Sequence, residues 1–68
     1  MPSINIKIEK GRAVDVKRRL VKELTQVVVE NLGVLPDRVT ITIDEYDREN
    51  WGTGGELHID KYGNPQIC

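Results

Sequence analysis

Residues 3–9 read Ser-Ile-Asn-Ile-Lys-Ile-Glu and place an isoleucine at every second position. This two-residue period predicts a β-strand with one apolar face. Residues 38–44, Arg-Val-Thr-Ile-Thr-Ile-Asp, repeat the period with β-branched side chains and predict a second strand. Between them, the apolar residues of segment 14–32 recur at spacings of three and four, which predicts an amphipathic helix. Gly33 suits the position after a helix end, and Pro36 stops the helix from continuing.

The order strand, helix, strand predicts a right-handed βαβ unit with parallel strands. The chain from Glu45 onward is polar and rich in turn-forming residues. Its glycines at 52, 54 and 55, with a short strand over residues 56–60, predict a hairpin or ribbon over residues 52–60. Gly63-Asn64-Pro65 predicts a loop that ends it. We therefore expect one α/β domain over residues 1–68, whose segment 58–68 is a tail of undefined structure.

The small size of the chain predicts that it assembles with partners. A domain of 68 residues buries only about 60% of its unfolded surface and usually needs a disulfide, a metal or oligomerisation. Cys68 is the single cysteine, so no intrachain disulfide can form. Two parallel strands and one helix also leave a sheet face and strand edges uncovered. We therefore expect a closed, symmetric homo-oligomer.

Composition argues against several classes of partner and cofactor. The net charge is −1, whereas nucleic-acid-binding domains are usually clearly basic. The longest apolar run, residues 27–29, is too short to span a membrane, and no charged-then-apolar leader opens the sequence, so we expect a cytoplasmic protein. One histidine and one cysteine cannot fill a tetrahedral zinc site without carboxylates. Residues 52–55 lack the lysine of a phosphate-binding loop, and residues 44–49 do not have calcium-loop spacing. We expect no nucleic acid, membrane, metal or cofactor.

Pro2 is the first candidate for a catalytic residue. Removal of Met1, which occurs when the second side chain is small, leaves a secondary amine at the start of the first strand. An α-amino group titrates near about 7.7–8.0, and apolar surroundings or a nearby cation lower that pKa. An amine that is neutral at pH 7 can act as a general base.

Further motifs accompany Pro2. They are an alternating first strand, a Gly-Arg pair that closes it, an amphipathic helix, a second strand ending in Ile-Asp-Glu, and an aromatic-Gly-x-Gly-Gly-Glu motif. The residues are Ile4–Ile8, Gly11-Arg12, residues 14–32, Ile43–Glu45 and Trp51–Glu56. With this set of motifs the chain resembles the 4-oxalocrotonate tautomerase family from residue 2 to about residue 57.

The resemblance implies an isomerase that converts a 2-hydroxydienoate, or the enol of a 2-keto acid, to its keto form. It implies that Pro2 is the base that moves a proton from the enol hydroxyl to a distant carbon. It implies that Arg12 binds the substrate carboxylate and lowers the pKa of Pro2, and that Trp51 walls the pocket. It also implies hexamers, built as trimers of dimers, and a setting in the degradation of aromatic compounds.

One position departs from the family. Its best-known members carry a second arginine early in the second strand, where this chain has Thr40. Arg38 lies two residues earlier, on the same predicted strand face but about 6.5–7 Å along it. Arg48, in the following loop, is another candidate cation. A monoacid substrate, and a diacid held by a different cation, both stay open.

Two alternatives to tautomerisation also stay open. Relatives use the same proline for hydratase, dehalogenase or decarboxylase chemistry, which needs an added group such as Glu45, Asp47 or Glu49. A non-enzymatic oligomerising module is the second alternative. It would bind a protein or an anionic ligand through the basic cluster of the helix, which comprises Lys17, Arg18, Arg19 and Lys22.

Overall fold

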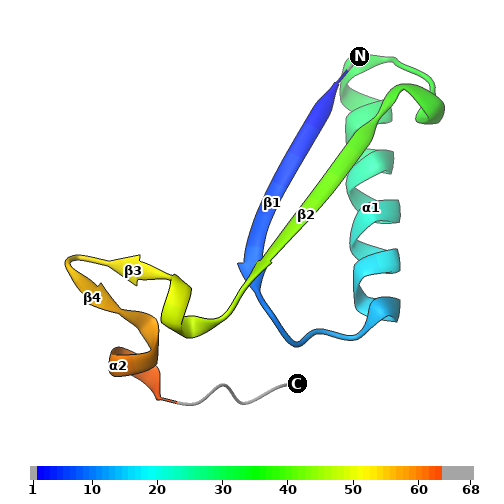
Figure 1. Cartoon of the computed structure of the whole chain (residues 1–68). Coiled ribbons are helices and arrows are strands. Elements are labelled where there is room, and N and C mark those ends of the chain that lie inside the picture. The colour runs from blue at the N-terminus through cyan, green and yellow to red at the C-terminus, as the bar shows by residue number, and fades with distance from the viewer. Residues whose placement is uncertain (1, 64–68) are drawn as a thin grey trace.

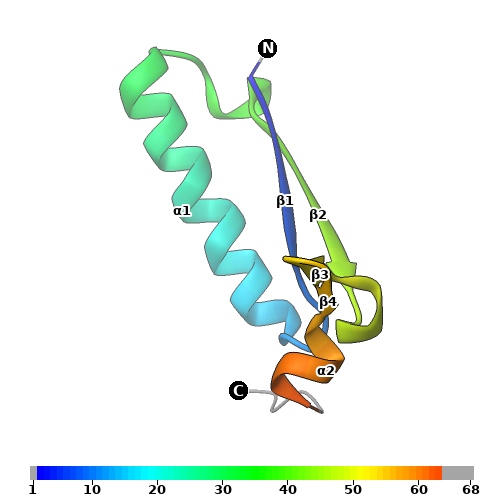
Figure 2. The ribbon, with the colours of Figure 1, turned by 90° about the vertical axis from the view of Figure 1, so that its left-hand side faces the viewer.

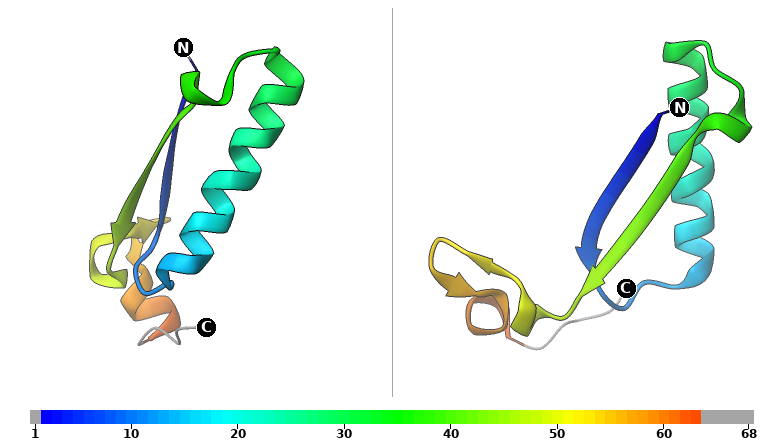
Figure 3. Two further views of the ribbon diagram at one scale, coloured as in Figure 1. Left: turned by 90° about the vertical axis from the view of Figure 1, so that its right-hand side faces the viewer. Right: turned by 45° about the horizontal axis from the view of Figure 1, so that its top comes forward.

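The computed structural model describes residues 2–63 of the chain. Strand β1 (Ser3–Glu9), helix α1 (Val14–Leu32) and strand β2 (Thr40–Tyr46) follow one another, and the two strands pair in parallel (Figure 1). Helix α1 lies along one face of this two-stranded sheet (Figures 2 and 3). The predicted βαβ unit is confirmed.

The two faces of the sheet differ in chemistry. The isoleucines of both strands are half-buried, whereas the polar residues that alternate with them are exposed. On the polar face the Asn5 amide donates a hydrogen bond to the Thr42 hydroxyl (2.7 Å), and Lys7 Nζ lies 3.3 Å from a carboxylate oxygen of Asp44. The alternation seen in the sequence thus separates an apolar face from a hydrogen-bonded polar face.

Helix α1 begins and ends at the predicted residues. Its last turn is capped by Gly33, which adopts a φ of 67° and whose N–H donates to the carbonyl of Val29 at 3.0 Å. A left-handed residue at this position favours glycine because glycine has no Cβ to clash.

The second strand begins two residues later than predicted. Pro36–Arg38 form a 3-10 turn, η1, with the Arg38 N–H bonded to the carbonyl of Leu35 at 2.9 Å. Proline favours such a turn because its ring fixes φ near the helical value. Arg38 therefore lies before the strand, and the prediction that it shares a strand face with Thr40 is wrong.

The glycine-rich segment forms the predicted hairpin. A short 3-10 turn, η2 (Arg48–Asn50), leads into the antiparallel pair β3 (Gly52–Thr53) and β4 (Glu56–Leu57). Gly54 and Gly55 make the connection with φ values of 65° and 85°. A two-residue hairpin turn with two positive φ values strongly favours glycine.

The predicted strand over residues 56–60 is wrong beyond Leu57. His58–Tyr62 form a short helix, α2, instead. The His58 N–H donates to the carbonyl of Trp51 at 2.8 Å, which closes the hairpin before the chain turns into α2. Gly63 has a φ of 71° and starts the predicted loop, whereas residues 64 and 65 of that loop lie outside the described residues.

The single chain does not enclose a core. No residue from 2 to 63 is fully buried, and Leu32 and Leu35 are 62% and 69% exposed. The radius of gyration is 15.0 Å, compared with about 11 Å for a compact domain of this length. No helix in this part of the chain is long and apolar enough to cross a membrane. The exposed apolar side chains are therefore available to partner surfaces.

Candidate functional site

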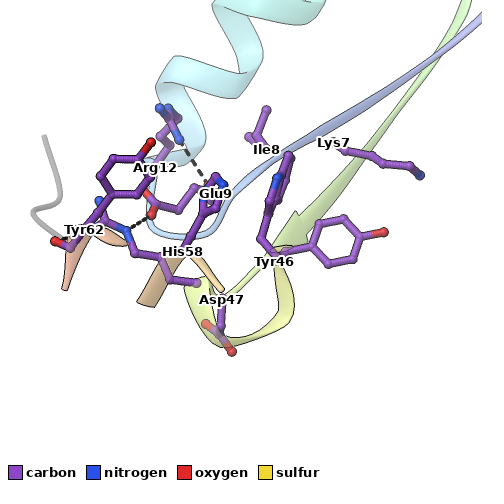
Figure 4. Close-up of a pocket in the computed structure, with 10 residues that line it drawn as sticks. Lys7, Ile8, Glu9, Arg12, Tyr46, Asp47, His58 and Tyr62 are labelled. Carbon is purple, nitrogen blue, oxygen red and sulfur yellow. Dashed lines mark hydrogen bonds and ion pairs between the residues drawn. The ribbon is translucent and has the colours of Figure 1, made fainter. Parts of the chain in front are cut away.

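A pocket of about 470 Å³ lies where β1 and β2 end and the hairpin and α2 begin. Arg12 and Trp51, two of the predicted site residues, both line it. Glu9 and Tyr62 lie beside Arg12 in the close-up of this pocket (Figure 4), and Arg48 also lines it. The structure therefore brings the first strand, the Gly-Arg loop and the C-terminal helix to one place.

Arg12 is held in the loop between β1 and α1. Its guanidinium donates a hydrogen bond to the backbone carbonyl of Glu9 at 3.1 Å. Within residues 2–63 it forms no ion pair with a carboxylate. Its charge is therefore positioned by a neutral group and remains able to attract an anion.

Glu9 and Arg48 form an ion pair inside the pocket, although they lie 39 positions apart in the sequence. The Arg48 side chain is only 17% exposed and that of Glu9 is 32% exposed. Arg48 also donates to the carbonyls of Tyr62 (3.1 Å) and Gly63 (3.0 Å). This guanidinium therefore fastens the C-terminal end of α2 to the end of β1.

The hydrogen bond from Arg48 holds the pKa of Glu9 below its usual value of 4.5, and Coulombic attraction to Arg48 and Arg12 acts in the same direction. Glu9 is thus ionised at neutral pH. Glu9 was not among the predicted site residues. The alternation of the isoleucines predicts an exposed side chain at this position, whereas Glu9 is half-buried in the structure.

Aromatic rings form one wall of the pocket. Trp51 meets Tyr46 edge to face, with ring centroids 5.7 Å apart, and lies 5.8 Å from the ring of His58. His58 in turn contacts Tyr62 at 5.1 Å, and its Nε2 shares a hydrogen bond with the Thr53 hydroxyl at 3.0 Å. Of this wall, only Trp51 was predicted from the sequence, because the other rings belong to no motif that suggested a role.

Pro2 and Arg38 lie at the opposite end of the sheet. The Pro2 carbonyl accepts a hydrogen bond from the Thr40 N–H at 3.1 Å, and Arg38 lies in the turn just before Thr40. The length of β1 separates Pro2 from Arg12 by about 20 Å. Within one chain the charge of Arg12 therefore cannot lower the pKa of Pro2.

The carboxylates considered for water activation do not gather around Arg12. Glu45 forms an ion pair with Lys17 of α1 at 2.7 Å. Asp47 lines the pocket, but its carboxylate points away from Arg12 (Figure 4). Glu49 lines an adjoining, smaller pocket of about 330 Å³. None of the three is placed beside the Arg12 guanidinium in this chain.

The basic cluster of α1 is partly neutralised. Lys17 is paired with Glu45 (2.7 Å), and Arg18 is paired with Asp15 (2.5 Å) on a strongly exposed helix surface. Exposed pairs of this kind are common on solvated helices. The cluster is therefore a mixed-charge face rather than a uniformly basic one.

Comparison with known proteins gives consistent matches. The family model for tautomerase enzymes matches residues 2–61. A probable tautomerase of Dickeya dadantii is 42% identical over 57 residues, which cover 82% of this chain and 85% of the relative. The 2-hydroxymuconate tautomerase of Bacillus subtilis is 29% identical over 56 residues, which cover 82% of this chain and 90% of the relative. A structure from the 4-oxalocrotonate tautomerase isozymes of Methylibium petroleiphilum superposes with a TM-score of 0.85 at 35% identity, covering 88% of this chain and 94% of that one.

Proposed function

The chain belongs to the tautomerase enzyme family, as a 4-oxalocrotonate tautomerase homologue, and from this we propose that it is a keto–enol isomerase that uses the amine of Pro2 as its base. The substrate class is the 2-hydroxydienoates and the enols of 2-keto acids. The observation that carries the proposal is that the family match begins at Pro2 itself and includes the pocket residues Arg12 and Trp51.

The fold supplies a reason for proline at this position. The bond from the Thr40 N–H to the Pro2 carbonyl ties Pro2 to the start of the parallel sheet. Once Met1 is removed, the ring nitrogen of Pro2 becomes a secondary amine on a rigid support. It takes the proton of the enol hydroxyl while the O–H electron pair forms the ketone. The resulting ammonium then returns a proton to a carbon of the conjugated chain, so that no atom is gained or lost.

Arg12 and Trp51 have complementary roles in this reaction. The Arg12 guanidinium binds the substrate carboxylate and stabilises the negative charge that spreads toward it in the dienolate. Trp51 and the neighbouring rings exclude water from the conjugated chain, which strengthens that electrostatic attraction.

The separation of Pro2 from Arg12 bears on assembly. A site that uses both residues needs Pro2 from one subunit and Arg12 from another, because about 20 Å of strand lies between them in one chain. The exposed apolar side chains of the single chain support the same conclusion. We therefore include a homo-oligomer in the proposal, and the resemblance favours a hexamer built as a trimer of dimers.

Turnover of the processed protein tests the proposal. Untagged protein, shown by intact mass to lack Met1, is assayed on 2-hydroxymuconate and on the enol of phenylpyruvate, beside Pro2→Ala, Arg12→Ala and the control Arg18→Ala. Pro2→Ala replaces the rigid secondary amine by a mobile primary amine that is no longer held in place as a base, and we expect it to lower kcat/KM about 100-fold or more. Arg12→Ala removes a charge-assisted contact to the carboxylate and lowers kcat/KM by about 10- to 100-fold, whereas Arg18→Ala, on the exposed helix face, stays near wild type. A Pro2→Ala enzyme as fast as wild type refutes the mechanism.

A further inference from the structure

We propose that Glu9 determines which acids the pocket accepts. By neutralising Arg48, Glu9 leaves Arg12 as the cation that an incoming carboxylate meets, so the site favours enols with one carboxylate and a flat conjugated or aromatic body over dicarboxylates. This inference rests on the proposed function and specifies its substrate class.

Cationic side chains line the pocket, and each has a different partner. They are Lys7, Arg12 and Arg48. Lys7 is paired with Asp44 on the polar face of the sheet (3.3 Å), and it points away from Arg12 (Figure 4). Arg48 is paired with Glu9. Arg12 has only a neutral carbonyl as its hydrogen-bond acceptor within residues 2–63.

Glu9 acts on both guanidiniums, which makes it the centre of this arrangement. Its backbone carbonyl accepts the hydrogen bond from Arg12, and its carboxylate accepts the one from Arg48. A second substrate carboxylate near Arg48 would be attracted by the Arg48 guanidinium but also repelled by the Glu9 carboxylate beside it. The pocket therefore selects substrates by their number of negative charges, and Glu9 supplies the repulsion that disfavours dicarboxylates.

The wall of the pocket favours the body of such a substrate. The rings of Trp51, His58 and Tyr62 follow one another at centroid distances of 5.8 Å and 5.1 Å. A flat conjugated chain or an aromatic ring stacks on surfaces of this kind. One end of the ligand thus meets Arg12 and the rest meets aromatic carbon.

Removal of the Glu9 charge should weaken the preference for monoanions over dianions without disrupting the pocket. In Glu9→Gln, Arg48 keeps its two acceptors on the carbonyls of Tyr62 and Gly63. The substitution removes the negative charge of Glu9, which repels a second substrate carboxylate near Arg48. An added net charge a few ångströms from a bound dianion shifts the ratio of dianion to monoanion affinity by about tenfold.

Trp51 provides a direct assay because it is the single tryptophan of the chain and lines the pocket. Its fluorescence is followed while phenylacetate, a monoanion, or 4-carboxyphenylacetate, a dianion, is added to the processed, assembled protein. The matched control is Asp15→Asn, which removes a carboxylate from an arginine pair outside the pocket. Glu9→Asp keeps the charge and serves as the conservative variant.

We expect wild type to bind the monoanion more tightly than the dianion. We expect Glu9→Gln to raise the ratio of dianion to monoanion affinity about tenfold, and Glu9→Asp and Asp15→Asn to leave it near the wild-type value. Tighter binding of the dianion by wild type overturns the inference even if Glu9→Gln does not fold. An unchanged ratio in folded Glu9→Gln overturns it too. Because the titration needs no turnover, an inactive enzyme that keeps the predicted preferences contradicts only the proposed function.

Discussion

Pro2 and Arg12 lie at opposite ends of β1: Pro2 directly precedes the first residue of the strand, and Arg12 follows its last residue, Glu9, by three positions. About 20 Å of extended chain separates them. If both act on one substrate molecule, the two residues must come from different subunits. Each subunit would then contribute to more than one site.

Mixing two variants of low activity tests this arrangement. Pro2→Ala and Arg12→Ala subunits, unfolded together and reassembled in equal amounts, should recover about a quarter of the wild-type activity, because about one site in four then combines an intact Pro2 with an intact Arg12. Each variant alone should show no more than about a tenth of the wild-type activity. The control is the mean activity of the two variants reassembled separately. A mixture no more active than this mean would show that one chain supplies both residues.

A blocked amino terminus should abolish activity. An extension of a few residues before Pro2 turns its amine into an amide nitrogen, which has no basic electron pair to accept a proton. The same extension placed after Cys68 leaves the amine intact and serves as the control. We expect turnover to fall about 100-fold or more with the amino-terminal extension, as for loss of a general base, and to stay near wild type with the carboxyl-terminal one. Equal rates for the two proteins would remove Pro2 from the mechanism.

The elements that depend on local sequence could be predicted, and those that depend on distant contacts could not. Strand β1 and helix α1 have the predicted bounds because periodicity and the Gly33 cap are local signals. The start of β2 was missed because Pro36–Arg38 form a tight turn that an alternating pattern does not reveal. Helix α2 was missed because its end is fastened by Arg48 through carbonyl hydrogen bonds.

The residues of the candidate site also divide into those with a local sequence signal and those that depend on distant contacts. The family motif identified Arg12 and Trp51, and the structure places both in one pocket. Glu9 was missed because its importance comes from Arg48, 39 residues away in the sequence. The distance between Pro2 and Arg12 follows from the bounds of β1, but its consequence for assembly depends on partner subunits. The functional roles of Pro2, Arg12, Trp51 and Arg38 stay predictions.

Arg48→Lys should loosen α2. A lysine can keep the positive charge opposite Glu9, but it cannot make the same set of directed hydrogen bonds to Glu9 and the carbonyls of Tyr62 and Gly63. We expect a loss of about 1–3 kcal/mol of stability, as for hydrogen bonds to charged groups, and faster amide exchange in His58–Tyr62. The control is Arg18→Lys, whose partner Asp15 is exposed, for which we expect a loss of less than about 1 kcal/mol. Unchanged exchange in α2 would show that Arg48 does not fasten it.

Gly55→Ala should destabilise the hairpin through its backbone alone. Gly55 has a φ of 85°, and no heavy atom lies within 4 Å of the position that a Cβ would take. The cost is therefore conformational, about 1–2 kcal/mol for an L-residue in this region. Gly52→Ala is the control, because its φ is not in the left-handed region and the new Cβ meets its nearest neighbour, the Glu56 carbonyl, at an ordinary 3.7 Å. Thermal unfolding at one protein concentration compares them, and equal stabilities would contradict the strain argument.

The Glu9–Arg48 pair should make stability depend on pH in the acid range. Arg48 lowers the pKa of Glu9 below 4.5 in the folded state. A carboxylate with a lowered folded-state pKa stabilises the fold in full above its unfolded pKa and loses that contribution as the pH falls through the folded-state pKa. The difference in free energy of unfolding between wild type and Glu9→Gln should therefore be constant near neutral pH and shrink progressively below about pH 4.5. Urea unfolding at fixed protein concentration measures this difference, with Glu23→Gln on the exposed face of α1 as the control. A difference that stays constant into the acid range would mean that the pair does not stabilise the folded chain.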